Sequence, residues 1–174
     1  MFAHTALNAL GILLASFISL WLGLINLICA FLLWWYSNLL KRLPFWGNLT
    51  VALLTGFTLL VLMVYYRSVD LIVIIYAFFA FGITLIREII KDIEDVRGDA
   101  SYGGHTLPVV YGIRRTKLIL LYIIIPFVLS LILFLVKLQN HYLLIYFGIL
   151  SVPFAYFVWR LIRAHAKKHF SFLS

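Results

Sequence analysis

Charged side chains are scarce in this sequence. Only 11% of its 174 residues are Asp, Glu, Lys or Arg, whereas 65% are hydrophobic and the mean hydropathy is +1.09. A soluble domain carries roughly 25% charged residues, so this composition excludes an ordinary water-soluble fold. It predicts an integral membrane protein whose length gives room for one domain, residues 1–174.

Cysteine and the features of a secretion signal are also lacking. The single cysteine, Cys29, lies in an apolar run, which excludes a disulfide framework. The first residues, Met-Phe-Ala-His, contain no basic region, and no small-residue cleavage site interrupts the apolar run that follows. We therefore expect no cleaved signal peptide. The formal net charge of +8 bears on membrane topology, and we expect no nucleic-acid partner.

Long apolar runs make up most of the chain. One membrane-spanning helix needs ~20 residues. The 31 residues from Ala6 to Tyr36 exceed that length and predict two helices, with Gly23 and Asn26 placing a tight turn at residues 21–26. The predicted fold class is all-α, a polytopic transmembrane bundle of about six helices. These helices are expected near residues 5–21, 24–38, 48–65, 71–90, 117–136 and 141–160.

Basic residues are distributed unevenly between the predicted loops. Six crossings place loops 39–47 and 91–116 on the same side of the membrane as the C-terminal tail. The opposite turns contain only Arg67 and Lys137. Because cytoplasmic loops carry the excess of Lys and Arg, we expect the richer side to face the cytoplasm, in a multi-pass protein of the cell inner membrane. The residues of positive charge on that side are Lys41, Arg42, Lys91, Arg97, Arg114, Arg115 and Lys117, together with Arg160, Arg163, Lys167 and Lys168 in the C-terminal tail.

The few acidic residues are concentrated in one stretch. Five of the six lie within residues 88–99, and only Asp70 lies elsewhere. On a helix, the i, i+3, i+7 spacing of Asp92, Asp95 and Asp99 places them within ~60° of one another, in a stripe ~10 Å long. Like charges on one face repel unless a cation lies among them. Mg²⁺ takes oxygen ligands and bridges to phosphate oxygens, so the pattern favours a Mg²⁺–diphosphate site at a membrane surface.

A solvated helix end is the alternative interpretation of this stretch. Lys91 and Arg97 would then partner the acids in surface ion pairs, each of which stabilises little. The predicted topology favours the diphosphate site, because it places the basic pair Lys41 and Arg42 on the same membrane face as the acids. A diphosphate needs carboxylates that hold metal and cations that bind the remaining oxygens.

The motifs around these residues resemble those of a known family. Residues 87–99 read Arg-Glu-x-x-Lys-Asp-x-x-Asp-x-x-x-Asp and are followed by Gly104 and by Thr-Leu-Pro-Val at 106–109. This pattern resembles the second aspartate-rich motif of the UbiA superfamily of intramembrane prenyltransferases. Residues 36–52, with Tyr-Ser-x-x-Leu-Lys-Arg at their start, resemble the segment between that family's fourth and fifth helices. The chain looks most like the branch that prenylates geranylgeranylglyceryl phosphate.

The resemblance implies both a fold and a reaction. The chain would be the C-terminal part of a nine-helix bundle around a central cavity. The implied reaction is Mg²⁺-dependent transfer of an isoprenoid group from a prenyl diphosphate to a lipophilic acceptor in the bilayer, a glyceryl phosphate lipid or an aromatic quinone precursor. The implied catalytic carboxylates, which would also hold Mg²⁺, are Asp92, Asp95 and Asp99. The implied diphosphate-binding residues are Tyr36, Lys41, Arg42 and Lys91.

One family feature is missing from the sequence. The first aspartate-rich motif, Asn-Asp-x-x-Asp-x-x-x-Asp, does not occur in it. We expect either that the protein begins upstream or that the chain is a truncated relative. The second case leaves open a non-catalytic relative or a membrane assembly subunit. Phosphoalcohol transferases are disfavoured because their Asp-Gly-x-x-Ala-Arg signature is absent, and ion transporters because they place acids at mid-membrane.

Overall fold

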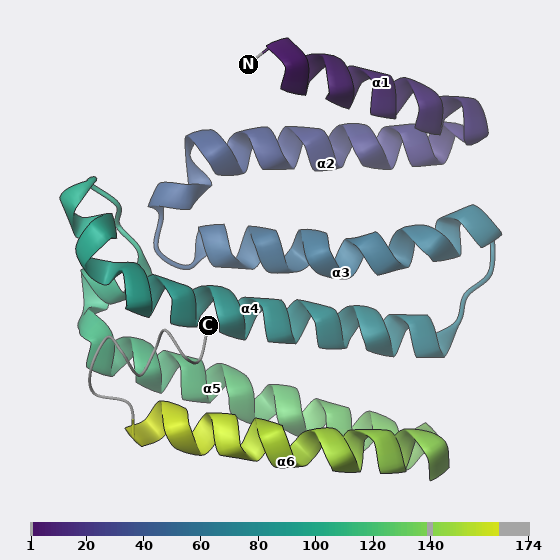
Figure 1. The fold of residues 1–174 in the computed structure, drawn as a ribbon. Helices are drawn as coiled ribbons and strands as arrows, with labels where there is room; N and C mark the ends of the chain where they lie inside the picture. Colours follow the sequence, from purple (N-terminus) through teal and green to yellow (C-terminus); the bar gives the residue numbers. More distant parts are fainter. Residues whose placement is uncertain (1, 139–140, 164–174) are drawn as a thin grey trace. The chain divides into compact units, whose positions relative to one another are not determined.

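The computed structural model describes residues 2–138 and 141–163, and within these ranges its regular secondary structure is helical, with short connections between the helices (Figure 1). The all-α fold class is therefore confirmed. By its internal contacts the chain divides into two units, residues 1–81 and 82–174, with the boundary inside a helix. The helices in chain order are α1 (Phe2–Ile18), α2 (Leu20–Asn38), the 3₁₀ turn η1 (Leu40–Arg42), α3 (Trp46–Tyr66), α4 (Leu71–Ser101), α5 (Leu107–Leu138) and α6 (His141–Arg163).

Five of the described helices, α2 to α6, are long and apolar enough to cross a bilayer. This confirms a polytopic membrane protein. The helix α1 has 17 residues. At 1.5 Å per residue it is about 25 Å long, somewhat shorter than a hydrocarbon core of ~30 Å. A sixth crossing by α1 stays a prediction.

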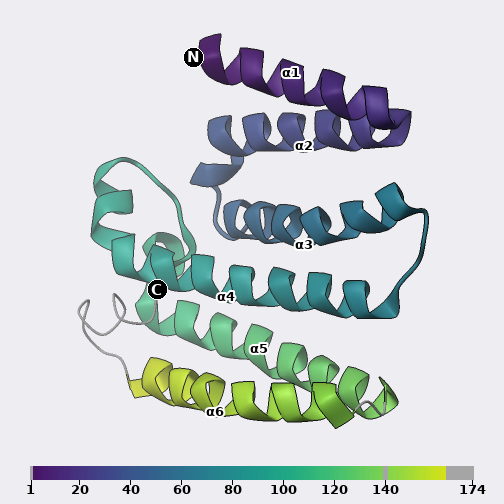
Figure 2. The same cartoon turned by 45° about the vertical axis from the view of Figure 1, so that its right-hand side comes forward.

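The break between α1 and α2 lies at Ser19, so the predicted turn at residues 21–26 was wrong. Ser19 has extended backbone angles, φ −159° and ψ 135°, while Gly23 lies buried inside α2. A Cβ atom at Gly23 would overlap Oγ of Ser16 on α1. The glycine therefore serves the close approach of two helices, which pack as an antiparallel hairpin (Figures 1 and 2).

The turn after α2 packs closely against the start of α3. A Cβ atom at Gly47 would lie 3.0 Å from the carbonyl oxygen of Leu40. Three further residues on this part of α3, Asn48, Thr50 and Ala52, are buried. The Thr50 hydroxyl donates a hydrogen bond of 2.8 Å to the carbonyl oxygen of Trp46, so a buried polar group is satisfied within its own helix. The turn is thus held by backbone contact.

The helix α4 continues well beyond residue 90, where we expected it to end. Its 31 residues make it about 46 Å long, against a hydrocarbon core of ~30 Å. The sequence shows why it continues: Ile86, Ile89, Ile90 and Ile93 have the spacing of one helix face, and all four are buried. The first charge in the helix is Arg87, so the acidic end of α4 extends past its apolar part.

The predicted loop 91–116 is mostly helical, and only residues 102–106 connect α4 to α5. The start of the fifth helix, which we expected near residue 117, was therefore placed too late. The helix α5 begins at Leu107 with Pro108 in its first turn, a position where proline is favoured. Its backbone is kinked at Gly112, which has φ 79° and ψ 157°. The helix α6 begins at His141 as predicted and lies beside α5 (Figure 2). Residues 139–140, which lie between the fifth and sixth predicted helices, and two basic residues of the C-terminal tail, Lys167 and Lys168, lie outside the described residues.

Candidate metal and diphosphate site

The three aspartates of the stripe lie on one helix, as their spacing requires. Asp92, Asp95 and Asp99 all belong to α4; Asp95 is exposed, and the other two are half-buried. At ~100° per residue, the stripe is turned by roughly 140° from the buried isoleucine face of the same helix. The carboxylates therefore face away from the surface that α4 buries.

The stripe is too extended for one ion to contact all of it. Asp92 and Asp99 are separated by about 10 Å along the helix axis, and successive members by ~5–6 Å between Cβ atoms. In the described part of the chain, no three His, Cys, Asp or Glu side chains converge as a metal cluster. Each adjacent pair still offers hard oxygen donors. Such pairs fit Mg²⁺, which keeps several waters and binds one or two carboxylates together with substrate phosphates.

Two acids outside the stripe have hydrogen-bond partners of their own. Glu88 accepts a hydrogen bond of 3.3 Å from Nη1 of its neighbour Arg87. Asp70 lies at the other end of α4, where its Oδ1 accepts a hydrogen bond of 2.8 Å from the backbone N–H of Ile72. A carboxylate at that position satisfies a free N–H group and complements the helix dipole. Asp70 thus has a structural role at the helix start.

The last residue of the stripe is tied to the following loop. The Thr106 hydroxyl donates a hydrogen bond of 3.0 Å to Oδ2 of Asp99. The loop turns back through Gly103, at φ 71°, and the Gly104 N–H donates a bond of 2.8 Å to the Asp99 carbonyl oxygen. The Gly103 N–H donates one of 3.4 Å to the Ala100 carbonyl oxygen. This is the Schellman pattern of helix termination, and it brings Thr106 over the end of α4.

Sequence reasoning used Thr106 only as part of a motif and missed this contact. The signal available in the sequence was weak. A threonine seven residues beyond an aspartate, with two glycines between them, allows the chain to fold back. The hydrogen bond itself depends on where the helix ends, which the sequence placed some ten residues too early.

The basic candidates lie on or beside the turn between α2 and α3. Lys41 and Arg42 are in η1 and are exposed. Tyr36, half-buried in the last turns of α2, has its Cε2 atom 3.5 Å from where a Cβ of Gly47 would lie, so its ring packs against this turn. These residues belong to the unit 1–81 and the aspartates to the unit 82–174. The expected meeting of the two sets at one membrane face therefore stays a prediction. Lys91, the fourth candidate, is exposed on α4.

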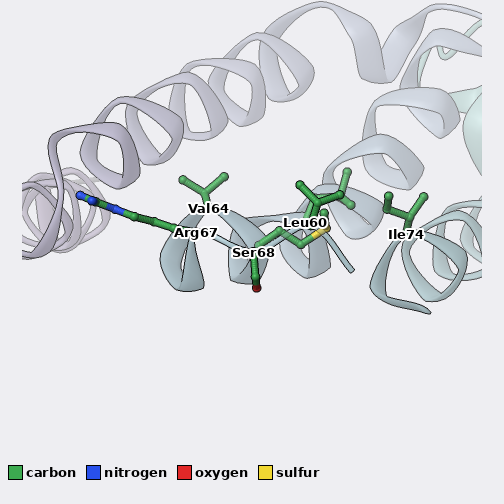
Figure 3. A pocket seen from close by; sticks show the side chains of 7 residues that line it. Leu60, Val64, Arg67, Ser68 and Ile74 are labelled. Atoms are coloured by element: carbon green, nitrogen blue, oxygen red, sulfur yellow. The ribbon is translucent and has the colours of Figure 1, made fainter. Parts of the chain in front are cut away.

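An apolar hollow of about 610 Å³ lies at the far end of α3 (Figure 3). It opens beside the turn from α3 to α4, and Figure 3 shows the side chain of Arg67 directed away from Ile74. Because α3 has 21 residues, this end is about 30 Å from η1 along the helix. The hollow is thus separate from the basic turn. Its lining residues are Leu60, Met63, Val64, Arg67, Ser68, Val69 and Ile74.

Comparison with known proteins identifies the family. The model of the UbiA prenyltransferase family matches residues 1–173. The digeranylgeranylglyceryl phosphate synthase of Methanosphaera stadtmanae is 36% identical over 159 residues, which cover 91% of this chain and 58% of that protein. The enzyme of the same name from Thermococcus kodakarensis is 41% identical over 110 residues, covering 63% of this chain and 39% of that protein.

The chain spans less than two thirds of the length of these relatives. No solved structure shows a significant match. The family model, however, covers nearly every residue, and it agrees with the helical membrane fold and with the motif resemblance. The chain therefore belongs to the UbiA prenyltransferase family.

Proposed function

We propose that this chain forms part of a membrane prenyltransferase, which transfers an isoprenoid group from a prenyl diphosphate to a lipophilic acceptor in a Mg²⁺-dependent reaction. The observation that carries the proposal is the stripe of Asp92, Asp95 and Asp99 on the charged C-terminal part of α4. Family membership supports it. Because the relatives are named digeranylgeranylglyceryl phosphate synthase, we propose a glyceryl phosphate lipid as acceptor rather than an aromatic quinone precursor.

The carboxylates of the stripe would hold the metal. Adjacent members, Asp92 with Asp95 and Asp95 with Asp99, would each offer oxygens to a hydrated Mg²⁺ ion, which as a rule binds one or two carboxylates together with substrate phosphates. Bound there, the metal supplies neutralisation of the negative charge that develops on the leaving diphosphate. Fixing the carboxylates on one rigid helix keeps the donor positions constant through the reaction.

The basic residues would bind the diphosphate oxygens that the metal leaves free. The guanidinium of Arg42 offers a planar fork of donors, and the ammonium of Lys41 offers a compact charge. Lys91 and the hydroxyl of Tyr36 would add donors to the same group. Both Lys41 and Arg42 are exposed on η1, where a water-borne diphosphate headgroup could reach them.

The reaction balances without a redox partner. The bond between the prenyl C1 and the diphosphate oxygen breaks, and a bond forms between C1 and the acceptor hydroxyl oxygen. The hydroxyl proton is released and the diphosphate leaves with its electron pair. The apolar segment of α4, residues 71–86, carries no charged side chain that would attack C1 in place of the acceptor hydroxyl. Excluding water from the isoprenoid favours transfer to the acceptor over hydrolysis.

We propose that the site faces the cytoplasm at the cell inner membrane.

A non-catalytic subunit is the second candidate. It is favoured by one observation: outside residues 88–99 the only acid is Asp70, which has its own role at the start of α4. A chain with one carboxylate cluster would bind metal and diphosphate and leave transfer to a partner polypeptide. The two candidates differ in turnover by the purified chain.

The test is transfer by the purified protein in liposomes. Labelled geranylgeranyl diphosphate and geranylgeranylglyceryl phosphate are supplied with Mg²⁺ or with EDTA. We expect labelled product only with Mg²⁺, a loss of at least a hundredfold in D95N, and near-normal transfer in E94Q, which removes a charge on another face of the same helix. Metal binding without transfer would support the subunit. Normal transfer by D95N would overturn the metal assignment.

A further inference from the structure

We propose that Thr106 is a positioning residue of the metal site: its hydroxyl orients the Asp99 carboxylate so that one oxygen is held and the other is presented to the cation. This inference rests on the proposed function. It goes beyond the three carboxylates, because Thr106 belongs to a different segment, at the start of α5.

The hydrogen bond gives the two oxygens of the Asp99 carboxylate different roles. Oδ2 accepts from the Thr106 hydroxyl at 3.0 Å, and Oδ1 is left for another ligand. An ionised carboxylate accepts several hydrogen bonds or metal contacts, so the two are compatible. Asp99 lies in the last turn of α4, two residues before its end at Ser101. Without the Thr106 bond, the Asp99 side chain would lose conformational entropy when it binds metal. Because the bond already orders the side chain, less entropy is lost on binding.

The loop that carries Thr106 is fixed by contacts that need no metal. A Cβ atom at Gly104 would lie 3.1 Å from the Asp99 carbonyl oxygen and 3.4 Å from the Asp99 Cβ, so the loop backbone touches residue 99 directly. The Gly104 N–H bond to the same carbonyl, at 2.8 Å, holds that approach. The position of the loop is therefore set by the end of α4.

Thr106 is also anchored from its other side. Its carbonyl oxygen accepts hydrogen bonds from the N–H groups of Val109, at 3.1 Å, and Val110, at 3.0 Å, which form the first turn of α5. Thr106 thus joins the last turn of one helix to the first turn of the next. A donor fixed at both ends suits the orientation of a metal ligand, since outer hydrogen bonds to ligating carboxylates set their direction.

The test uses Mn²⁺, a paramagnetic substitute for Mg²⁺, titrated into the full chain in lipid nanodiscs and followed by electron paramagnetic resonance. Removing an outer hydrogen bond typically weakens metal binding by roughly 10–100-fold, so we expect at least a tenfold loss in T106V. T106S keeps the hydroxyl and should bind within about twofold of the unsubstituted protein. The matched control is T58V, because the Thr58 hydroxyl donates within α3, at 2.6 Å to the Thr55 carbonyl.

One further variant, T106A, and one further measurement, the unfolding temperature, keep the result unambiguous. T106A removes the same hydroxyl without adding bulk, so it must show the same loss as T106V even if the valine disturbs the loop. A purely structural role would lower the unfolding temperature without changing the Mn²⁺ spectrum of the folded protein. Normal Mn²⁺ binding in T106V and T106A overturns the inference and leaves the proposed function standing. An equal loss in T106S overturns it too. Absence of Mn²⁺ binding in the unsubstituted protein overturns both.

Discussion

The hydroxyl oxygen of Thr106 lies 3.0 Å from Oδ2 of Asp99 and joins the end of α4 to the start of α5. The five-residue turn between these helices, residues 102–106, is short because Gly103 adopts a left-handed conformation. The candidate metal site therefore depends on the way in which a helix ends as well as on the carboxylates themselves.

Replacing Gly103 should destabilise the turn. At φ 71° a Cβ atom costs roughly 1–2 kcal/mol, so G103A should lower the free energy of unfolding by about that amount. It should also weaken Mn²⁺ binding, because Thr106 would shift relative to Asp99. The control is G98A, in the exposed helical part of α4 with nothing near its Cβ position, which should be neutral or slightly stabilising. Thermal unfolding in nanodiscs measures the stability of G103A and of G98A. Equal stability of the two variants would contradict the role given to the turn.

Replacing Gly23 should disturb the hairpin of α1 and α2. A Cβ atom at this position overlaps Ser16, and overpacking of this kind costs roughly 1–3 kcal/mol. G23A should therefore unfold at a lower temperature than the unsubstituted protein, while G11A, where space is open, should not. The double variant G23A/S16G should recover much of the loss. No recovery would mean that Gly23 serves something other than this helix contact.

Replacing Arg42 should weaken the binding of diphosphate. Removing a fork of charged donors from a phosphate contact should raise the dissociation constant for a prenyl diphosphate in R42Q by about tenfold, which corresponds to ~1.4 kcal/mol. The control is R67Q, because Arg67 lies at the opposite end of α3. Isothermal titration in detergent gives both constants. A larger effect at Arg67 than at Arg42 would place the diphosphate on the other membrane face.

Several parts of the fold could be predicted from hydrophobic pattern alone. The number of α-helices in residues 2–138 and 141–163, and the start of α6 at His141, follow from long apolar runs separated by polar residues. The placement of all three aspartates on one helix follows from their spacing. These features depend on periodicity, which is a property of the local sequence.

The wrongly predicted turn at residues 21–26 and the wrongly predicted end of α4 arose because the same residue types occur in two kinds of structure. Gly23 was interpreted as a turn residue, yet it serves a close helix contact, which sequence alone does not distinguish from a turn. The charged residues after Arg87 were interpreted as the end of α4, because a loop is normally polar. The buried face of Ile89, Ile90 and Ile93 outweighs that signal, and the helix continues to Ser101. The contact between Asp99 and Thr106 depends on this longer helix.

The most direct test of the account is Mn²⁺ binding by the unsubstituted protein, D95N and E94Q in nanodiscs. Asp95 is the central member of the stripe and is shared by both adjacent pairs, so D95N should weaken binding by at least a hundredfold. Glu94 lies on another face of α4, and E94Q should bind as the unsubstituted protein does. Equal binding by D95N and the unsubstituted protein, or an equal loss in both variants, would show that the stripe does not hold a divalent ion.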